Sequence, residues 1–477
     1  MGSKGRTRCE HMGMSGHEQT DRSRRLREPG ASHVISLNEK DCAPDPARFD
    51  PIEGNYFVAA YPPFSLWTEK GARSWEAVLA SPSRDVPWLV YAHVPFCARR
   101  CDFCYYLSYA GKSQMEIKRY ITAVLAEAER VAVAPIFEGR MPEVMYVGGG
   151  TPSLLSPDEL ASFLGGLTRI FGGVTCREFT VEVAPQTTCS DGLMVLKTCG
   201  VTRVSMGVQQ MDDEVLMASG RIHRTCDVER AWADIDAADF QTTNLDLIAG
   251  LPGETDESFL HGLDCVIAMR PDSVTIYPLE VPRNTPLAKS LREGRQEAAV
   301  PGWPVKRRRM REAFERLELA GYHRLTAYAA VRDPGQHPFL YMEQQYTGGD
   351  LLGLGAGSFG FLNGIYGQNI ARYDDYIARI EAAESPVMRG YVLSEDERAT
   401  REFVLCLKLG SANRRHLRGR YGRELLPHMD EPLERFVAAG WIEIDADTVR
   451  VTPEGLLCVD NMIRQLVMPH HREASYW

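Results

Sequence analysis

Long apolar runs are absent from this chain of 477 residues. None approaches the roughly eighteen apolar residues that a membrane-spanning helix requires, and no apolar signal segment opens the sequence. A surplus of basic residues is missing too, because 54 Lys and Arg stand against 64 Asp and Glu, for a net charge of −10. We therefore expect a cytoplasmic protein, with no membrane and no nucleic acid among its partners.

Cysteine is sparse, at twelve residues, and most of these are scattered. Cys97, Cys101 and Cys104 are the exception, since they follow a strand-like run, residues 89–94, at C-x3-C-x2-C spacing. Three thiolates at this spacing can hold three irons of a 4Fe–4S cluster and leave the fourth iron open. An open iron indicates chemistry rather than electron storage. Its natural occupant is S-adenosylmethionine, whose reductive cleavage gives a 5′-deoxyadenosyl radical.

A zinc site and a disulfide are the alternatives. Zinc favours four closing ligands, commonly in C-x2-C pairs, and no fourth Cys or His follows close downstream. His93 precedes the first cysteine on the expected strand, where it is poorly aimed at the same site. A disulfide requires an oxidising compartment, which the absent signal segment argues against.

Short β-rich runs alternate with helical runs through the first half of the chain, the pattern of βα units around a parallel sheet. Capping boxes at Ser113 and Ser156 mark two helix starts. The expected strands are residues 88–94, 144–147, 178–183, 203–208, 242–248 and 273–277. Chemistry in such barrels collects at the carboxyl ends of the strands.

Glycines and polar residues follow these strand ends. Gly148, Gly149 and Gly150 allow a ligand to approach the backbone closely, and a plain tight turn is the alternative. The polar residues at or beyond strand ends are Glu182, Gln209, Arg221 and Asp246. For each of them, ordinary solvation and ion pairing at a barrel mouth is the alternative.

The cysteine loop and these motifs at the strand ends resemble those of the radical S-adenosylmethionine enzymes. They are most similar to relatives of the oxygen-independent coproporphyrinogen III oxidase, a group with haem chaperones, haem-degrading enzymes and radical methyltransferases. The resemblance runs from about Tyr61 to the C-terminus. It implies an α/β fold, an open partial (β/α)6 barrel with a C-terminal helical, winged-helix-like cap. It also implies an oxygen-sensitive 4Fe–4S cluster, one or two S-adenosylmethionines, a small-molecule substrate and a flavodoxin- or ferredoxin-like electron donor.

The resemblance also implies roles for single residues. Arg221 would bind the carboxylate of S-adenosylmethionine, while carboxylates bind its ribose hydroxyls and ammonium group. Gln344, in a late glycine-rich segment, matches a residue near a second S-adenosylmethionine. The full set of residues expected to bind this cofactor is Tyr91, Gly148, Gly149, Gly150, Thr151, Glu182, Gln209, Arg221, Asp246, Ile248 and Gln344.

Five parts are expected along the chain. Helical runs after Ser394, two alternating strands within residues 441–452 and a last helix near residues 453–467 indicate the cap. The parts are a disordered basic tail (1–50), an N-terminal segment packing on the barrel (51–87), the core barrel (88–330), an extension (331–393) and the cap (394–477).

Departures from the oxidase pattern guide the functional hypothesis. Tyr106 stands where the oxidase has a fourth cysteine. Residues 275–282 stand where the oxidase has a motif next to its substrate, so Tyr106 and Glu280 are candidate substrate contacts. We therefore expect C-methylation, or cyclopropanation, of an aromatic or heteroaromatic specialised metabolite. The alternatives are oxidative decarboxylation of coproporphyrinogen III and a haem chaperone, for which His470 and His471 are possible haem ligands.

Overall fold

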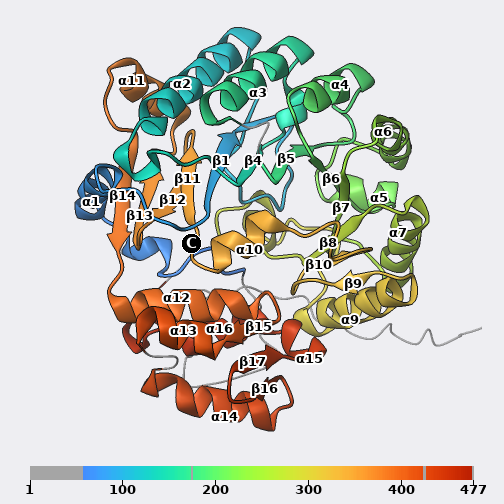
Figure 1. The fold of residues 1–477 in the computed structure, drawn as a ribbon. Helices are drawn as coiled ribbons and strands as arrows, with labels where there is room; N and C mark the ends of the chain where they lie inside the picture. Colours follow the sequence, from blue (N-terminus) through green and yellow to red (C-terminus); the bar gives the residue numbers. More distant parts are fainter. Residues whose placement is uncertain (1–56, 173–175, 423–425, 475–477) are drawn as a thin grey trace, which may run out of the picture. The chain divides into compact units, whose positions relative to one another are not determined.

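The computed structural model describes residues 57–172, 176–422 and 426–474 (Figure 1). All of these belong to one compact unit, Ile35–Trp477. The basic tail expected over residues 1–50 lies outside the described residues. Within the described ranges, no helix combines the length and the apolar character that a membrane crossing demands.

A twelve-stranded sheet forms the centre of the fold, in the order β14-β13-β12-β11-β1-β4-β5-β6-β7-β8-β10-β9. Its middle seven strands are parallel: β11 (Asp350–Leu354), β1 (Trp88–Val94), β4 (Val144–Gly149), β5 (Glu178–Val183), β6 (Arg203–Gln209), β7 (Thr242–Ala249) and β8 (Ser273–Pro278). Six of these strands were predicted, and each ends within two residues of its expected bound. The prediction succeeds because each of these strands, buried on both faces, reads as a short run rich in residues that favour β-structure.

Antiparallel strands extend the sheet at both edges. One edge carries β12 (Phe359–Leu362), β13 (Ile365–Asn369) and β14 (Val387–Val392), and the other carries β10 (Ala329–Val331) and β9 (His323–Arg324). The sheet therefore continues through the extension expected at 331–393. The proposed domain bounds themselves stay predictions.

Helices connect the parallel strands and cover the outer face of the sheet, as Figure 1 shows. Both predicted capping boxes are present, since Glu116 and Glu159 bond back to the backbone N–H groups of Ser113 and Ser156. The connecting helices are α2 (Gln114–Ala132), α3 (Pro157–Phe171), α4 (Ser190–Thr198), α5 (Asp213–Ala218), α6 (Thr225–Ala238), α7 (Asp256–Met269), α8 (Pro286–Arg292) and α9 (Trp303–Leu319).

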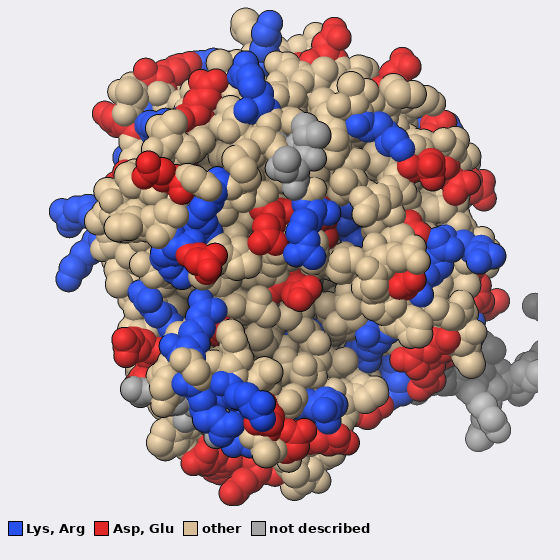
Figure 2. All heavy atoms as spheres, in the orientation of Figure 1, with Lys and Arg blue, Asp and Glu red and all other residues tan. Residues whose placement is uncertain are grey.

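Helix α10 (Leu340–Tyr346) lies at the amino ends of the parallel strands. The Leu340 backbone N–H donates to the Glu178 carboxylate at the start of β5, over 2.8 Å. Figure 2 views the face that carries this helix, and acidic and basic side chains are interspersed on it. Chemistry at the carboxyl ends of the strands therefore lies at the opposite end of the strands from α10.

The N-terminal segment packs on the edge formed by β12–β14. Trp67 stacks on Tyr366 of β13 at 4.6 Å between ring centroids, and both rings are buried. Helix α1 (Glu69–Leu79) crosses β14 so closely that a Cβ on Gly71 would lie 1.9 Å from the Gly390 carbonyl oxygen. The aromatic ring of Trp67 therefore packs in the protein core.

The C-terminal cap combines helices with a three-stranded sheet in the order β15-β17-β16. The hairpin expected within residues 441–452 is confirmed by β16 and β17. The single helix expected near residues 453–467 is wrong, because the chain leaves helical geometry at Cys458 and forms two short helices. The elements are α12 (Glu395–Leu407), β15 (Ser411–Asn413), α13 (Arg414–Tyr421), α14 (Asp430–Ala438), β16 (Ile442–Ile444), β17 (Thr448–Val451), α15 (Pro453–Leu456) and α16 (Val459–Leu466).

Candidate functional site

The three cysteines lie in a loop at the carboxyl end of β1. A short parallel pair, β2 (Phe96–Cys97) with β3 (Tyr109–Ala110), closes this loop. The loop is tied to the barrel because the Asp102 backbone N–H donates to the Ser219 carbonyl over 3.2 Å. All three thiols are partly buried.

The chemistry of this loop fits a 4Fe–4S cluster. Burial raises the pKa of Cys97, and burial together with the neighbouring Cys101 raises the pKa of Cys104 to about 12. Three thiolates here therefore need a source of positive charge, which iron supplies. Arg221 Nη1 lies 3.4 Å from the Cys101 sulfur and Thr151 Oγ1 lies 3.5 Å from the Cys97 sulfur. Such donors stabilise cluster-bound sulfur.

A cavity of about 240 Å³ opens beside the cysteine loop. Most of the residues singled out in the sequence line it, from six successive strands and their loops. They are Cys101, Cys104, Tyr106, Gly149, Gly150, Thr151, Glu182, Gln209, Arg221, Asp246, Ile248 and Glu280. Their roles toward S-adenosylmethionine and substrate stay predictions.

Glu182 is a carboxylate of the cavity that two donors hold in place. It accepts hydrogen bonds from the Gly149 backbone N–H at 2.9 Å and the Tyr146 hydroxyl at 2.8 Å. Burial outweighs these donors and raises the pKa of Glu182 to about 7. The carboxylate is therefore poised to gain a positively charged or hydroxyl-bearing ligand near neutral pH.

The glycine word has a packing reason in this structure. A Cβ on Gly148 would lie 2.6 Å from the Glu182 carboxyl carbon, and one on Gly149 would lie 2.2 Å from the His93 ring. Gly149 also has φ of +111°, which side chains other than hydrogen rarely tolerate. Close packing thus requires glycine at these two positions, and the expected role of the three glycines toward S-adenosylmethionine stays a prediction, with Gly149 and Gly150 bordering the cavity.

Asp246 and Arg221 are fixed by neighbours. The Asp246 carboxylate accepts from Ser205 Oγ at 3.0 Å and Asn244 Nδ2 at 2.8 Å, and burial raises its pKa. Arg221 Nη2 donates to the Gly207 carbonyl at 2.7 Å, which holds its guanidinium between the cysteine loop and the cavity. Both charged groups are thus preorganised at the carboxyl ends of β6 and β7.

Tyr91 and His93 support the site from behind. The Tyr91 hydroxyl lies 2.9 Å from His93 Nδ1, and His93 Nε2 lies 3.0 Å from the Leu107 carbonyl. Burial lowers the pKa of His93 to about 4, so the ring is neutral at physiological pH. Both of its nitrogens have partners, in agreement with the expectation that His93 is not a cluster ligand.

Gln344 is not brought to the cavity. It lies on α10, where its amide donates to the Glu143 carboxylate over 2.8 Å, just before the start of β4. The physical reason is the direction of β11, which follows Gln344 and runs parallel to β1. Gln344 therefore lies at the amino ends of the strands, and the cysteines lie at the carboxyl ends.

An aromatic wall lines the cavity, and the sequence analysis identified only Tyr106 within it as a candidate substrate contact. Tyr105 stacks on Tyr106 at 4.8 Å between ring centroids, and Tyr277 packs against Tyr328 at 5.4 Å. The other aromatic residues of the wall are Phe57, Phe103, Tyr146 and Phe339. The pair Tyr105 and Tyr106, next to the last cysteine, was the one local signal for the rest of the wall.

Glu280 lies within this wall and is 9 % exposed. Its Oε1 accepts the Phe57 backbone N–H, and Oε2 has no hydrogen-bond partner among the described residues. Burial raises the pKa of Glu280 to about 8. An unsatisfied buried carboxylate in a cavity wall is a candidate for ligand recognition.

Comparison with known proteins agrees with this site. The profile of the Radical SAM superfamily matches residues 91–266. The haem chaperone HemW of Mycobacterium tuberculosis is 29% identical over 391 residues, 81% of this chain and 96% of that protein. HemW of Escherichia coli is 30% identical over 281 residues, 57% of this chain and 70% of that protein.

The oxygen-independent coproporphyrinogen III oxidase of Escherichia coli is 27% identical over 407 residues, 81% of this chain and 86% of that protein. The solved structure of the Escherichia coli oxidase HemN has the same fold, with a TM-score of 0.74 and 24% identity over 86% of this chain and 96% of that one. This chain therefore belongs to the radical SAM superfamily, as a relative of HemN and HemW, and its membership implies a 4Fe–4S cluster and S-adenosylmethionine.

Proposed function

We propose that this chain is an enzyme that cleaves S-adenosylmethionine reductively and directs the resulting radical at an organic substrate in the barrel cavity. The observation that carries the proposal is the convergence of the cysteine loop with Glu182, Arg221 and Asp246 around one cavity. When bound, the cluster supplies one electron that splits S-adenosylmethionine into methionine and a 5′-deoxyadenosyl radical. A flavodoxin- or ferredoxin-like protein would deliver that electron.

Different residues of the cavity would bind different groups of S-adenosylmethionine. Arg221 would hold the carboxylate of S-adenosylmethionine next to Cys101, which its guanidinium already approaches. Glu182 and Asp246, at the ends of β5 and β7, would accept from the ammonium group and the ribose hydroxyls. Thr151, Gln209 and Ile248 border the same space.

The substrate would occupy the remainder of the cavity, between the tyrosines and Glu280. The aromatic wall favours a flat, partly apolar body, and Glu280 favours an N–H donor or a cation on it. Among the described lining residues, the basic side chains are Arg203 and Arg221, against the carboxylates of Glu182, Asp246 and Glu280. This balance disfavours a substrate that carries several carboxylates.

Three candidate functions have different support, and the first and third of them use the radical. Oxidative decarboxylation of coproporphyrinogen III is supported by the similarity to HemN. Haem transfer is supported by the similarity to HemW. C-methylation or cyclopropanation of an aromatic metabolite has no support in the reported relatives, and depends on the sequence departures at Tyr106 and residues 275–282 alone.

One anaerobic experiment separates the reactions. Reconstituted protein is incubated with dithionite, S-adenosylmethionine and coproporphyrinogen III, and 5′-deoxyadenosine, S-adenosylhomocysteine and porphyrin products are quantified by mass spectrometry. Deoxyadenosine with protoporphyrinogen IX identifies the decarboxylase. Deoxyadenosine without porphyrin turnover sends the search to aromatic substrates, where S-adenosylhomocysteine would identify methylation. Haem binding at one equivalent without deoxyadenosine would overturn the enzymatic proposal in favour of the chaperone.

Two cysteine variants control the assay. Cys101→Ala removes one cluster ligand and is expected to abolish deoxyadenosine formation. Cys226→Ala removes an exposed cysteine on α6 and is expected to leave it unchanged. Normal deoxyadenosine formation by the Cys101 variant would contradict the assignment of the cluster ligands.

A further inference from the structure

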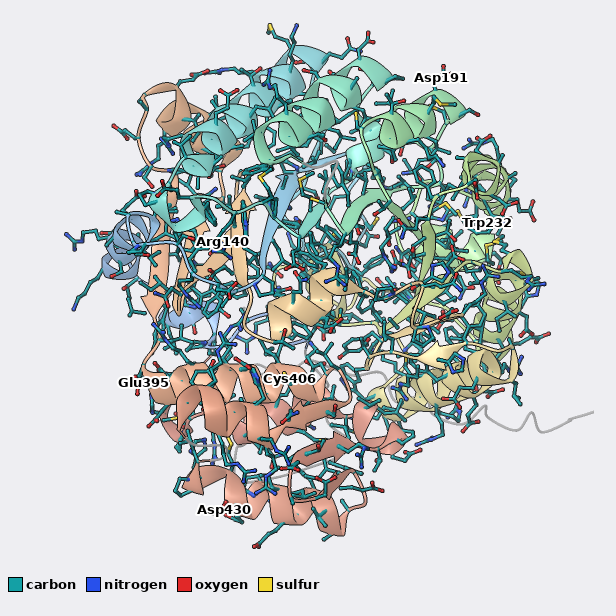
Figure 3. The ribbon with its side chains drawn as sticks, viewed as in Figure 1. Arg140, Asp191, Trp232, Glu395, Cys406 and Asp430 are labelled. Atoms are coloured by element: carbon teal, nitrogen blue, oxygen red, sulfur yellow. The ribbon has the colours of Figure 1, made fainter. Side chains whose placement is uncertain are left out.

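Three metal-ligating side chains meet outside the barrel, where the C-terminal end returns to the start of the cap. Glu397 lies in the first turn of α12, and His470 and His471 lie in the short 3-10 helix Pro469–His471. One ligand atom from each of the three side chains lies within 4.8 Å of the other two. Figure 3 labels Glu395 at the start of α12, which locates this end of the helix below β14.

The distances suit a tetrahedral ion. His471 Nε2 lies 3.3 Å from Glu397 Oε1, and His470 Nε2 lies 4.0 Å from the same oxygen. Ligand atoms at about 2.0–2.2 Å from zinc in tetrahedral geometry are separated from one another by about 3.3–3.6 Å. The separation of His470 Nε2 from Glu397 is longer than this tetrahedral distance. The His470 side chain is 63% exposed, so a rotamer change can bring it closer.

Second partners already orient the two buried ligands. His471 Nδ1 lies 2.8 Å from the Tyr61 hydroxyl, so its Nε2 points toward Glu397. The Tyr391 hydroxyl donates to Glu397 Oε1 at 2.6 Å, and the Ser394 backbone N–H donates to Oε2 at 2.7 Å. Metal-binding histidines and carboxylates are characteristically held in this way through their other atoms.

The surroundings also supply an entry path. His471 is 3% exposed whereas His470 stands at the surface, so an ion would reach the site from the solvent side. The alternative is a simple hydrogen bond from His471 Nε2 to Glu397, which needs nothing from His470.

We propose that Glu397, His470 and His471 bind one divalent transition-metal ion of the zinc class, with a fourth position open to solvent. Imidazole and carboxylate ligands favour Zn²⁺, Co²⁺ or Ni²⁺ over Mg²⁺ and Ca²⁺. The ion joins the last helix of the chain to α12 and, through Tyr61 and Tyr391, to the N-terminal segment and β14. The site is separate from the cysteine loop and independent of the reaction proposed above.

The test measures zinc directly. Cluster-loaded protein is dialysed against micromolar Zn²⁺, and zinc and iron per chain are determined by mass spectrometry. The wild type is expected to retain one more zinc per chain than His470→Ala, and to gain roughly 3 °C in melting temperature that this variant does not gain. His323→Ala, which removes an exposed histidine on β9, is the matched control and is expected to behave as the wild type.

Equal zinc content in the wild type and His470→Ala would overturn the proposal. Glu397→Gln, which keeps the size of the side chain but weakens the ligand, gives an independent check and is also expected to lose the zinc. The iron content shows whether zinc has instead displaced the cluster, since such displacement would lower iron equally in every variant. Deoxyadenosine formation plays no part in this test, so its outcome is independent of the proposed function.

Discussion

Glu182 and Glu280 are both buried carboxylates of the cavity, but their surroundings differ. Glu182 accepts from a backbone N–H and a tyrosine hydroxyl, whereas one oxygen of Glu280 lacks a partner among the described residues. Burial raises the pKa of the first to about 7 and of the second to about 8. We infer that Glu182 binds the cofactor in a fixed orientation, and that the free oxygen of Glu280 accepts a hydrogen bond from the substrate.

Glu182→Gln is expected to weaken binding of S-adenosylmethionine about 10-fold, the effect of losing about 1.4 kcal/mol. A carboxylate attracts the ammonium and ribose groups more strongly than a carboxamide does. Because the pKa of Glu182 is about 7, its ionised fraction grows as pH rises from about 6 to about 8. The Kd of the wild type should therefore fall over this range, and that of the variant should stay level, as measured by equilibrium dialysis.

Glu129→Gln is the matched control for this substitution, because Glu129 is an exposed residue of α2 paired with Arg169 at the surface. It should leave the Kd and its pH profile unchanged. A Kd for Glu182→Gln equal to that of the wild type at pH 8 would show that Glu182 does not bind the cofactor.

Glu280→Gln is expected to stabilise the protein in a pH-dependent way. The folded-state pKa of about 8 exceeds the ordinary value of 4.5, so the folded protein holds a proton that the unfolded chain has lost between these two values. Stability from this group is therefore complete below about pH 4.5 and declines as pH rises toward 8. At pH 8.5 the variant should be more stable than the wild type by roughly 1–3 kcal/mol, and at pH 5 by little, as measured by urea denaturation.

The same variant should lower substrate turnover without lowering deoxyadenosine formation, because Glu280 lies on the substrate side of the cavity. Equal stability of both proteins at every pH would mean that Glu280 finds a partner outside the described residues. That result would remove the argument that its free oxygen awaits a ligand.

At the scale of elements, the carboxyl end of β4 carries the strictest packing demand near the site. Gly149 has φ of +111° and would place a Cβ 2.2 Å from His93, whose ring is fixed by Tyr91 and Leu107. The strand end, the buried histidine and Glu182 are therefore coupled. A change at this turn is transmitted to the carboxylate through the hydrogen bond from the Gly149 N–H.

Gly149→Ala is expected to destabilise the protein by about 2–4 kcal/mol, from backbone strain and from displacement of the His93 ring. It should also weaken S-adenosylmethionine binding more than 10-fold, because the N–H that holds Glu182 moves. Thermal unfolding and equilibrium dialysis measure the two effects. Gly165→Ala on α3, where a Cβ meets nothing within 4 Å, should instead stabilise slightly. Similar behaviour of the two variants would contradict this account.

Elements with strong local signals were predictable from the sequence. The six strands were visible as short β-rich runs, and capping boxes at Ser113 and Ser156 predicted the starts of two helices. Strand β11 was not recognised, because the sequence Gly353-Leu-Gly355 at its carboxyl end is typical of a loop. In the structure the apolar residues of β11 are fully buried between β1 and β12. The break at Cys458 between α15 and α16 also carries no glycine or proline to announce it.

The site was predictable only where the chain brings ligands together locally. The cysteines stand within one loop, and the residues after β4–β7 share one end of the sheet by the rule of parallel strands. Gln344 was misplaced because its position depends on the direction of β11. Most of the aromatic wall was missed because Phe57, Tyr277 and Tyr328 come from distant segments, which no periodicity connects.

At the scale of the whole molecule, one buried ion pair joins distant segments. Lys408 Nζ lies 3.0 Å from Asp460 Oδ1, and both side chains are fully buried. Lys408 also donates to the Val58 carbonyl at 3.0 Å, and Asp460 accepts from the Val58 N–H at 2.8 Å and from the Tyr328 hydroxyl. The pair thus fastens the end of α12 and α16 to the N-terminal segment and the barrel.

Asp460→Asn is expected to destabilise the protein by about 3–5 kcal/mol, because it leaves the ammonium group of Lys408 buried without a counter-charge. Lys408 is already strained in this respect, since burial lowers its pKa. Urea unfolding at pH 7 measures the loss. Asp264 is an exposed residue of α7 that pairs with Arg316, so Asp264→Asn should leave the midpoint of urea unfolding nearly unchanged.

The double variant Lys408→Met, Asp460→Leu sharpens the argument, because it removes both charges and fills their volume with apolar groups. It should recover most of the stability lost in Asp460→Asn, which makes the two substitutions strongly non-additive. If residues 394–477 fold as a separate domain, Asp460→Asn would split unfolding into two transitions, the cap melting first. A single transition shifted as a whole would show that the buried pair makes cap, barrel and N-terminal segment one cooperative unit.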